Sequence, residues 1–253
     1  MKKFFAIASL FALTLSACAE KEQEGEQQGK GRVDISLVTS AEVADTRAEI
    51  SCTTPELADF ALTIEGGRDY KAEYASIAEF EDNYLYYGTY KASVKAGDVA
   101  EEGFGKVAFV GSQEFEVTPR ANTNVTVTAT IANAVVKVET TENFKKYFEG
   151  GYALTLTTAA GNKFNVTAQE ELLFIAPAEF AVSGTATKQS AQSGKEGVTV
   201  TLPEFKQTEV AAQILYTVKM DVETAGSATL TITLNETLVE SIDIDQELND
   251  NAK

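Results

Sequence analysis

The sequence predicts an all-β protein, and three observations lead to that prediction. From Gly31 onward, apolar and polar residues alternate with a period of two, which is typical of strands with one buried face. Turn-forming residues, such as Gly161-Asn162, separate many of these runs. Helical periodicity is scarce. Since an open antiparallel sheet must bury its apolar face against another sheet, we expect two tandem antiparallel β-sandwich domains.

The chain begins with a predicted signal peptide over residues 1–17. Lys2 and Lys3 precede an apolar run at 4–15, which is shorter than the roughly 20 residues that a membrane span needs. The ending Leu15-Ser16-Ala17-Cys18 closely resembles the bacterial lipobox. That resemblance implies that Cys18 is acylated and that the peptide before it is removed. Cys18 would then anchor the protein in the outer membrane through its acyl chains.

Residues 18–30 are predicted to be an acidic flexible tether. Glu, Gln and Gly dominate this segment, and no large apolar residue occurs before Val33. Residues 19–26 resemble the export signal that follows the lipid-bearing cysteine in surface lipoproteins of Gram-negative gut anaerobes. A plain linker would have the same composition. We expect a lipid-anchored outer-membrane protein that faces the cell exterior.

The first domain is predicted to span residues 31–133. Residues 69–83 are expected to hold a short helix with Tyr70, Tyr74 and Ile77 on one side. The long Thr/Val strand ends near Ala132-Asn133, where we place the domain boundary. Alternation predicts the strands of this domain at 33–38, 60–65, 90–97, 113–119 and 122–131.

The second domain is predicted to span residues 134–247 and to join the first through a very short linker. Residues 141–150 are expected to hold one or two helical turns, which Gly150-Gly151 would end. Residues 248–253 are predicted to be a disordered tail. Alternation predicts the strands of this domain at 152–158, 163–168, 197–202, 212–223 and 227–234.

Composition excludes several functions. The formal charge of −17 becomes −19 without residues 1–17, because they hold Lys2 and Lys3 and no acidic residue, so the chain should repel nucleic acid and anionic headgroups. The chain has no His, which excludes Ser-His-Asp, Cys-His and His-based zinc sites, and no Gly-rich phosphate loop. We expect no enzyme, no catalytic residues, no cofactor and no metal. Carboxylate-pair chemistry stays open.

With Cys18 acylated, Cys52 is the only thiol, and we expect it to be a small buried or half-buried apolar residue.

Residues 85–97, LYYGTYKASVKAG, have a form common in prealbumin-like sandwiches of surface proteins. Gly88 permits the turn there, and Tyr90, Ala92 and Val94 would fill the inner face of the strand. With the lipobox and the strands around it, this order resembles the gut-anaerobe lipoprotein family catalogued as domain of unknown function 4493, over most of residues 55–245. Phe109 stands where tyrosine is usual in that family. The resemblance implies a cell-surface lipoprotein with prealbumin/immunoglobulin-like sandwich domains and no known activity.

A looser resemblance is to fimbrillin-type pilus subunits, which are matured by cleavage after an arginine that follows the first strand. Here residues 33–38 would be that strand, and Arg47-Ala48 the cleavage site. Its removal would open a groove of unpaired backbone groups for a strand of the next subunit. An exposed loop that is never cut explains Arg47 better, because a lone arginine in a polar loop is common.

We therefore expect a non-enzymatic surface lipoprotein that acts in adhesion or in fimbria-related assembly, with other surface proteins as partners. The alternative is a glycan-binding accessory lipoprotein of an outer-membrane nutrient-uptake system, with Tyr84 and Tyr86 as the ligand platform. Tyr87 would point to the opposite face, and we expect one of the two sets to belong to the core. Asp243, Asp245 and Glu247 share one strand face, which a solvated surface explains better than a calcium site.

Overall fold

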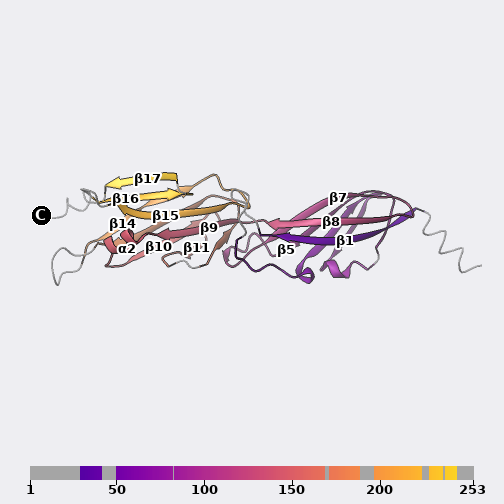
Figure 1. Ribbon diagram of the computed structural model, residues 1–253, viewed down its shortest axis with the longest axis horizontal. Helices are drawn as coiled ribbons and strands as arrows, with labels where there is room; N and C mark the ends of the chain where they lie inside the picture. The colour runs from indigo at the N-terminus through magenta and orange to yellow at the C-terminus, as the bar shows by residue number, and fades with distance from the viewer. Residues whose placement is uncertain are drawn as a thin grey trace, which may run out of the picture.

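The computed structural model describes residues 29–41, 50–81, 83–168, 171–188, 197–223, 228–235 and 237–243. It has two elongated lobes that lie end to end, so that the molecule is a rod (Figure 1). The described part of the chain starts at the outer end of the first lobe. Nearly all regular structure is β-strand, which confirms the predicted all-β class. No helix in the described ranges is long and apolar enough to cross a membrane.

The first lobe has one seven-stranded sheet with the order β3-β2-β5-β7-β8-β1-β4. Strands β7 and β8 are in register at Phe109–Ile131 and Val110–Thr130, and strands on both sides of this pair contribute to one core. Strand β6 belongs by sequence to this part of the chain and pairs with the second lobe. The strands in this part of the chain are β1 (Lys30–Ser40), β2 (Ala61–Gly66), β3 (Tyr70–Tyr74), β4 (Tyr84–Tyr86), β5 (Gly88–Ala96), β6 (Gly103–Phe104), β7 (Phe109–Val117) and β8 (Asn122–Ile131).

The second lobe is a sandwich of two sheets with the orders β11-β10-β13-β14 and β17-β16-β15-β9-β12-β6. Leu156 and Val182 from one sheet and Val138 and Val218 from the other are buried in a common core. Its strands are β9 (Ala134–Thr140), β10 (Tyr152–Thr158), β11 (Lys163–Asn165), β12 (Leu173–Ile175), β13 (Phe180–Thr187), β14 (Thr199–Gln207), β15 (Leu215–Glu223), β16 (Thr229–Leu234) and β17 (Thr237–Asp243).

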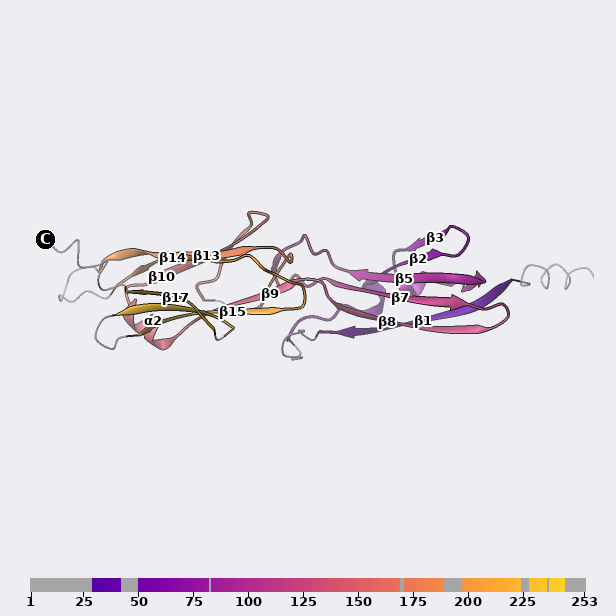
Figure 2. The same ribbon diagram turned by 90° about the horizontal axis from the view of Figure 1, so that it is seen from above.

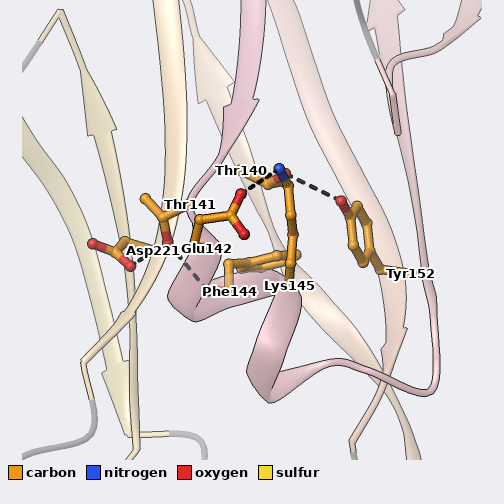
Figure 3. A network of polar contacts seen from close by, with 7 residues as sticks. All are labelled: Thr140, Thr141, Glu142, Phe144, Lys145, Tyr152 and Asp221. Atoms are coloured by element: carbon orange, nitrogen blue, oxygen red, sulfur yellow. Dashed lines mark hydrogen bonds and ion pairs between the residues drawn. The ribbon is translucent and has the colours of Figure 1, made fainter.

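Helix α2 (Glu142–Tyr147) confirms the helical turn predicted at 141–150. Thr141 caps it, because its Oγ1 accepts a hydrogen bond from the Phe144 N–H at 3.1 Å (Figure 3). The same hydroxyl donates to Asp221 on β15, which ties the helix to the sheet. Phe144 is fully buried against the second core. The Thr141 cap, the buried Phe144 side chain and the hydrogen bond to Asp221 explain why so short a helix is stable here.

The helix predicted at 69–83 is wrong. Residues 70–74 form strand β3, which pairs with β2, and only the 3₁₀ turn η2 (Ile77–Glu79) follows it. A second such turn, η1 (Leu57–Asp59), precedes β2. Tyr70, Ala72 and Tyr74 also satisfy a period of two, and pairing with β2 satisfies the backbone groups, so tertiary contacts decide between the two periods. The β2–β3 hairpin lies along the outer part of the first lobe (Figure 2).

The first strands of the two lobes have matching neighbours. Strand β1 pairs in parallel with β8 along nearly its whole length and in antiparallel with β4 over three residues. Strand β9 likewise pairs in parallel with β15 and in antiparallel with the three-residue strand β12. The sequence did not indicate these two parallel pairs. They give the lobes a common plan that no repeat in the sequence reveals.

Contacts around Glu102 join the lobes. Its carboxylate accepts hydrogen bonds from Thr158 Oγ1 at 2.6 Å, Asn162 Nδ2 at 2.8 Å and the Ala176 N–H at 3.0 Å. The next residues form β6, which adds to the free edge of β12. Asn133 is fully buried at the crossing between β8 and β9, and its Oδ1 accepts from the Ala108 N–H. These contacts favour a semi-rigid rod, while the boundaries 31–133 and 134–247 stay predictions.

Candidate functional site

The outer end of the first lobe gathers basic and aromatic side chains from four segments. We call this group the basic tip, and it lies at the opposite end of the rod from α2 (Figure 1). The start of β1, the β2–β3 turn, strand β4 with the residue after it, and the β7–β8 turn build it. The basic tip consists of Lys30, Arg32, Arg68, Tyr84, Tyr86, Tyr87 and Arg120.

The β2–β3 turn places Arg68 at the tip. A Cβ on Gly66 would lie 2.4 Å from the Thr89 carbonyl oxygen, and one on Gly67 would lie 2.9 Å from the Tyr90 ring. Only glycines therefore let this turn pack so closely on β5. Arg68 follows directly, and its guanidinium carbon lies 4.9 Å from the ring centre of Tyr86 and 4.7 Å from that of Tyr87. Both distances fit cation–π contacts.

Tyr90 supports the tip from beneath. Its ring is buried, stacks on Phe115 at 5.7 Å between ring centres, and contacts Tyr70 edge to face. Its hydroxyl donates a hydrogen bond of 2.9 Å to the Tyr86 carbonyl oxygen, which fixes β4 over the core. Burial raises the pKa of Tyr90, and the charge of Arg68 partly opposes that rise.

The other tip cations come from the start of β1 and from the β7–β8 turn. The Lys30 ammonium lies 5.1 Å from the ring centre of Tyr86, and the Lys30 carbonyl accepts a hydrogen bond from the Arg120 N–H at 2.9 Å. Arg120 is exposed. Arg32 forms an exposed ion pair of 3.1 Å with Asp34. The tip thus holds two cations, Lys30 and Arg68, over tyrosine rings and has Arg32 and Arg120 in the neighbouring segments.

The three tyrosines of this region are all exposed, at 41% for Tyr84, 43% for Tyr86 and 51% for Tyr87. The expectation that one set belongs to the core is therefore wrong. Leu85, between Tyr84 and Tyr86, is the core residue, and the turn after β4 leaves Tyr87 outside as well. Because Arg68 and Lys30 lie over the Tyr86 ring, this tyrosine offers less bare surface for a sugar than the sequence suggested.

Three other predicted site residues, Cys18, Arg47 and Ala48, lie outside the described residues. The predicted first strand at 33–38 lies within β1 and is confirmed as a strand. The Val33 N–H also donates to the Asn83 carbonyl at 2.7 Å, and from Asp34 onward the strand pairs, among the residues that the structure describes, with β8. Its apolar residues Ile35 and Leu37 are half-buried, and Val38 is 50% exposed. Most of β1 therefore has one strand edge that the short strand β4 does not cover.

Two pockets show where a small ligand would fit. One, of about 380 Å³, lies on the outer face of β2, β5 and β7, with Lys91 and Lys95 beside Thr63, Ser93 and Ser112. The other, of about 460 Å³, lies at the lobe junction between residues 51–53, Gly105, Glu171, Leu172 and Phe174. Glu171 is the single carboxylate lining it, so neither pocket supplies the facing pair that hydrolysis would need.

Cys52 is half-buried beside the first core, as the sequence indicated. Within the described ranges, no three His, Cys, Asp or Glu residues lie close enough together to hold a metal ion. Asp245 and Glu247, two of the three carboxylates considered for calcium, lie outside those ranges.

Sequence reasoning missed the cations of the tip. A signal was available, because three of the four arginines of the chain are Arg32, Arg68 and Arg120, and two of these stand in turn sequences, GGRD and TPRAN. These cations are close together only because four segments that are distant in the sequence meet in the fold. The residue pattern of each segment does not indicate where the other segments lie.

Comparison with solved structures finds several similar folds at low identity. The fimbrial anchor protein Mfa2 from Porphyromonas gingivalis is 10% identical, covers 84% of this chain and 99% of its own, and has a TM-score of 0.41. A protein from Bacteroides eggerthii, provisionally assigned to cell adhesion, is 11% identical, with 83% and 96% covered and a TM-score of 0.43. One from Bacteroides thetaiotaomicron, provisionally assigned to polysaccharide binding, is 8% identical, with 88% and 84% covered and a TM-score of 0.35.

No curated protein matches the chain. A family model does match, and it covers residues 29–250, which includes every residue that the structure describes. The chain therefore belongs to the family described as Domain of unknown function (DUF4493).

Proposed function

We propose that this chain is a lipid-anchored protein of the bacterial outer membrane, displayed on the cell surface, with a non-enzymatic role in adhesion or fimbria-related assembly. Cys18 carries the acyl chains, and residues 19–28 connect it to the rod. The rod then holds the edges and loops of the second lobe away from the bilayer. The sequence around Cys18 supports the anchor, and the two lobes lying end to end support the display.

The observation that most favours assembly is the position of β1. Its partner β8 contributes the buried residues Val125, Val127 and Ala129, whereas β1 is half-buried and pairs mainly with β8. If β1 were displaced, the edge of β8 would offer a row of unpaired backbone groups to a strand from another protein. Cleavage at Arg47-Ala48 would separate β1 from the rest of the chain and make that exchange irreversible.

A glycan-binding role is the second candidate. The exposed tyrosines at the tip favour it, since aromatic rings stack on sugars. The cations over Tyr86 and Tyr87 weigh against it, because a sugar would have to replace Arg68 on these rings. We rank assembly and adhesion first for that reason.

The anchor is tested by the intact mass and N-terminal residue of the protein taken from its native outer membrane. A chain that begins at Cys18 and carries the mass of acyl chains is the expected result for the anchored form. A chain that begins at Ala48 within large assemblies would identify a strand-exchanging subunit whose anchor is temporary. A chain that keeps residues 1–17 or lacks acyl groups on Cys18 would contradict the proposal.

Displacement of β1 is tested by locking it to β8. Ser36 Oγ and Thr126 Oγ1 lie 3.0 Å apart in register, so cysteines at these positions are placed to form a disulfide. The lock variant is Ser36→Cys with Thr126→Cys in a Cys52→Ser background, and Ser36→Cys alone in that background is the matched control. We expect the locked protein to assemble only after reduction. Equal assembly with and without the lock would rule out displacement of β1.

A further inference from the structure

The charge of this chain is unevenly distributed. It has 38 acidic residues against 21 basic ones, and the sequence predicts that it should repel anionic surfaces. The basic tip is the local exception, because it gathers Lys30, Arg32, Arg68 and Arg120 while only Asp34 and Asp69 lie in the same segments. The fourth arginine of the chain, Arg47, lies outside the described residues.

Most of these cations have no carboxylate partner. Arg32 pairs with Asp34, but within the described part of the chain Lys30, Arg68 and Arg120 form no ion pair. Lys30 and Arg68 lie over tyrosine rings, a contact that leaves their N–H donors directed elsewhere. The tip therefore offers several unused charged donors at one exposed end of the rod.

The backbone conformation at two of the tip arginines is strained. Arg68 has a φ of 59° and Arg120 a φ of 61°, in the left-handed region that favours glycine or asparagine. Two turns at the same end thus hold an arginine where a less strained residue would serve the turn better. Asp69, Gln213 and Asn235 share this conformation, so the two arginines stand out because both occur in turns at the same end of the rod.

We infer that the basic tip is a membrane-facing surface that binds the phosphate groups of anionic lipid headgroups. Arginine and lysine supply the charge, and Tyr84, Tyr86 and Tyr87 supply rings that suit the boundary between water and lipid. Together these residue types form the kind of surface that lies on a bilayer. This inference rests on the proposed anchorage at Cys18.

The start of the described chain places this surface near the bilayer. The Gly29 carbonyl accepts a hydrogen bond from the Tyr87 N–H at 2.7 Å, so the segment that leads to Cys18 enters the rod at the basic tip itself. Cys18 precedes Gly29 by 11 residues, which span at most about 40 Å when fully extended. The tip is therefore the part of the described rod that an anchored Cys18 would hold closest to the lipid.

The net negative charge of the chain does not cancel this attraction. At physiological salt, charges separated by more than about 8 Å are largely screened, so the acidic residues elsewhere on the rod contribute little at the tip. The predicted tether, with Glu20, Glu22, Glu24 and Glu26 against Lys21, is the segment whose acidic charge opposes the tip cations. Each basic residue near an anionic bilayer strengthens attachment about fivefold. The tip cations therefore act locally and hold the rod's base against the headgroups.

The test replaces the natural anchor, so that it does not depend on acylation. Residues 1–18 are exchanged for a histidine tag, which is the only histidine in the chain, and the protein is held on vesicles by a nickel-chelating lipid. The chain has no Trp, so Tyr84→Trp provides a single reporter at the tip. Val198→Trp is the matched control, because exposed Val198 accepts a hydrogen bond from the Lys188 N–H, and Lys188 lies over the ring of Tyr147 on α2 at the other end of the rod.

We expect brominated lipids to quench the reporter at position 84 on vesicles that contain phosphatidylglycerol, and to leave the reporter at 198 unquenched. The pair Arg68→Gln with Arg120→Gln should lower the equilibrium for tip contact about 25-fold, because each lost cation removes a factor of about five. High salt should have a similar effect. Lys145→Gln with Lys146→Gln, on α2 at the far end, should change nothing.

Three results would overturn the inference. These are equal quenching at positions 84 and 198, equal quenching on vesicles of phosphatidylcholine alone, and no effect of the arginine pair. Any of these results would reject the membrane-facing tip. If Cys18 is found acylated in the native protein, the proposed anchor would remain. Conversely, selective quenching at 84 with an unacylated native chain would reject the anchor while the tip retains its affinity for anionic lipid.

Discussion

Strands β1 and β9 open their lobes with the same pairing pattern but differ in burial. In β9, Ala134, Val135, Val136 and Val138 are all buried. In β1, Val33 is the one apolar side chain that is fully buried, while Ile35 and Leu37 are half-buried. β1 has four apolar residues other than glycine among its eleven, whereas β9 has four among seven, so composition accounts for part of the difference.

The two strands also differ in what lies beyond their first residues, although Val136 and Val138 are buried in the core of the second lobe itself. The first lobe covers the start of β9: Val135 belongs to the first core, β6 pairs with β12, and Glu102 binds three groups of the second lobe. At the corresponding end of the first lobe, β1 and β4 meet no further lobe, and the basic tip occupies that place. One plan thus yields a closed joint at one end and an uncovered surface at the other.

The strongest way to break this comparison is to place a charge on each first strand. Val136→Asp puts a carboxylate in a fully buried position, and we expect it to cost more than about 4 kcal/mol and to unfold the second lobe. Val38→Asp, at a position that is 50% exposed, should cost less than about 1 kcal/mol. Urea unfolding followed by far-ultraviolet circular dichroism measures both. Equal costs would mean that β1 is as firmly held as β9.

A second test removes the contacts that Glu102 of the first lobe makes with the second lobe. Glu102→Ala loses three hydrogen bonds to a half-buried carboxylate, and we expect a loss of about 1.5–3 kcal/mol. Glu102→Gln keeps one acceptor and should lose roughly half as much. Hydrogen exchange at 134–140 is the direct readout, because β9 should approach the exchange rates of β1. Unchanged protection of β9 would show that the joint does not cause the difference.

Much of the fold is predictable from single strands. Alternation alone identifies β2, β5, β7, β8 and β10, since a half-buried strand must show it. Thr141 and Gly150-Gly151 likewise mark α2 by local chemistry. Residues 70–74 were ambiguous between two periods, and the contact with β2 decided in favour of the strand.

Pairings between distant segments could not be predicted. The parallel contact of Ser36 with Thr126 joins residues 90 positions apart, and β6 consists of only two residues. The same holds for the candidate site, because Lys30, Arg68 and Arg120 come to one end only once the start of β1 and two turns have been placed. Local pattern determines a strand, whereas an interface needs the relative position of several.

A third prediction concerns the support beneath the tip. Tyr90→Phe removes the hydroxyl that donates to the Tyr86 carbonyl, and we expect a loss of about 1 kcal/mol at neutral pH. If the uncovered end of the first lobe depends on this bond, hydrogen exchange in β4 should rise while β12 stays protected. A uniform rise in both strands would argue against a local role.

The same variant has a defined pH dependence. Burial raises the pKa of Tyr90 above its ordinary value of 10.0, so folding favours the protonated hydroxyl. This contribution is complete below pH 10 and is lost as the pH rises through the higher pKa of the folded state. The gap in unfolding free energy between wild type and Tyr90→Phe should therefore shrink above pH 10. A gap that stays constant from pH 8 to pH 11 would contradict this.

The prediction with the smallest expected effect compares one residue at the tip with one residue beside the joint. Arg120 at the tip and Gln213 beside the joint both have left-handed backbone, with φ of 61° and 62°. Asparagine tolerates that conformation better, so Arg120→Asn and Gln213→Asn should each raise the unfolding free energy by a few tenths to about 1 kcal/mol. Thermal unfolding measures this gain. On phosphatidylglycerol vesicles, only Arg120→Asn should weaken the tip contact. A gain in stability with unchanged contact would mean that Arg120 serves neither the turn nor the membrane, and that the arginines of the tip act through Arg68 alone.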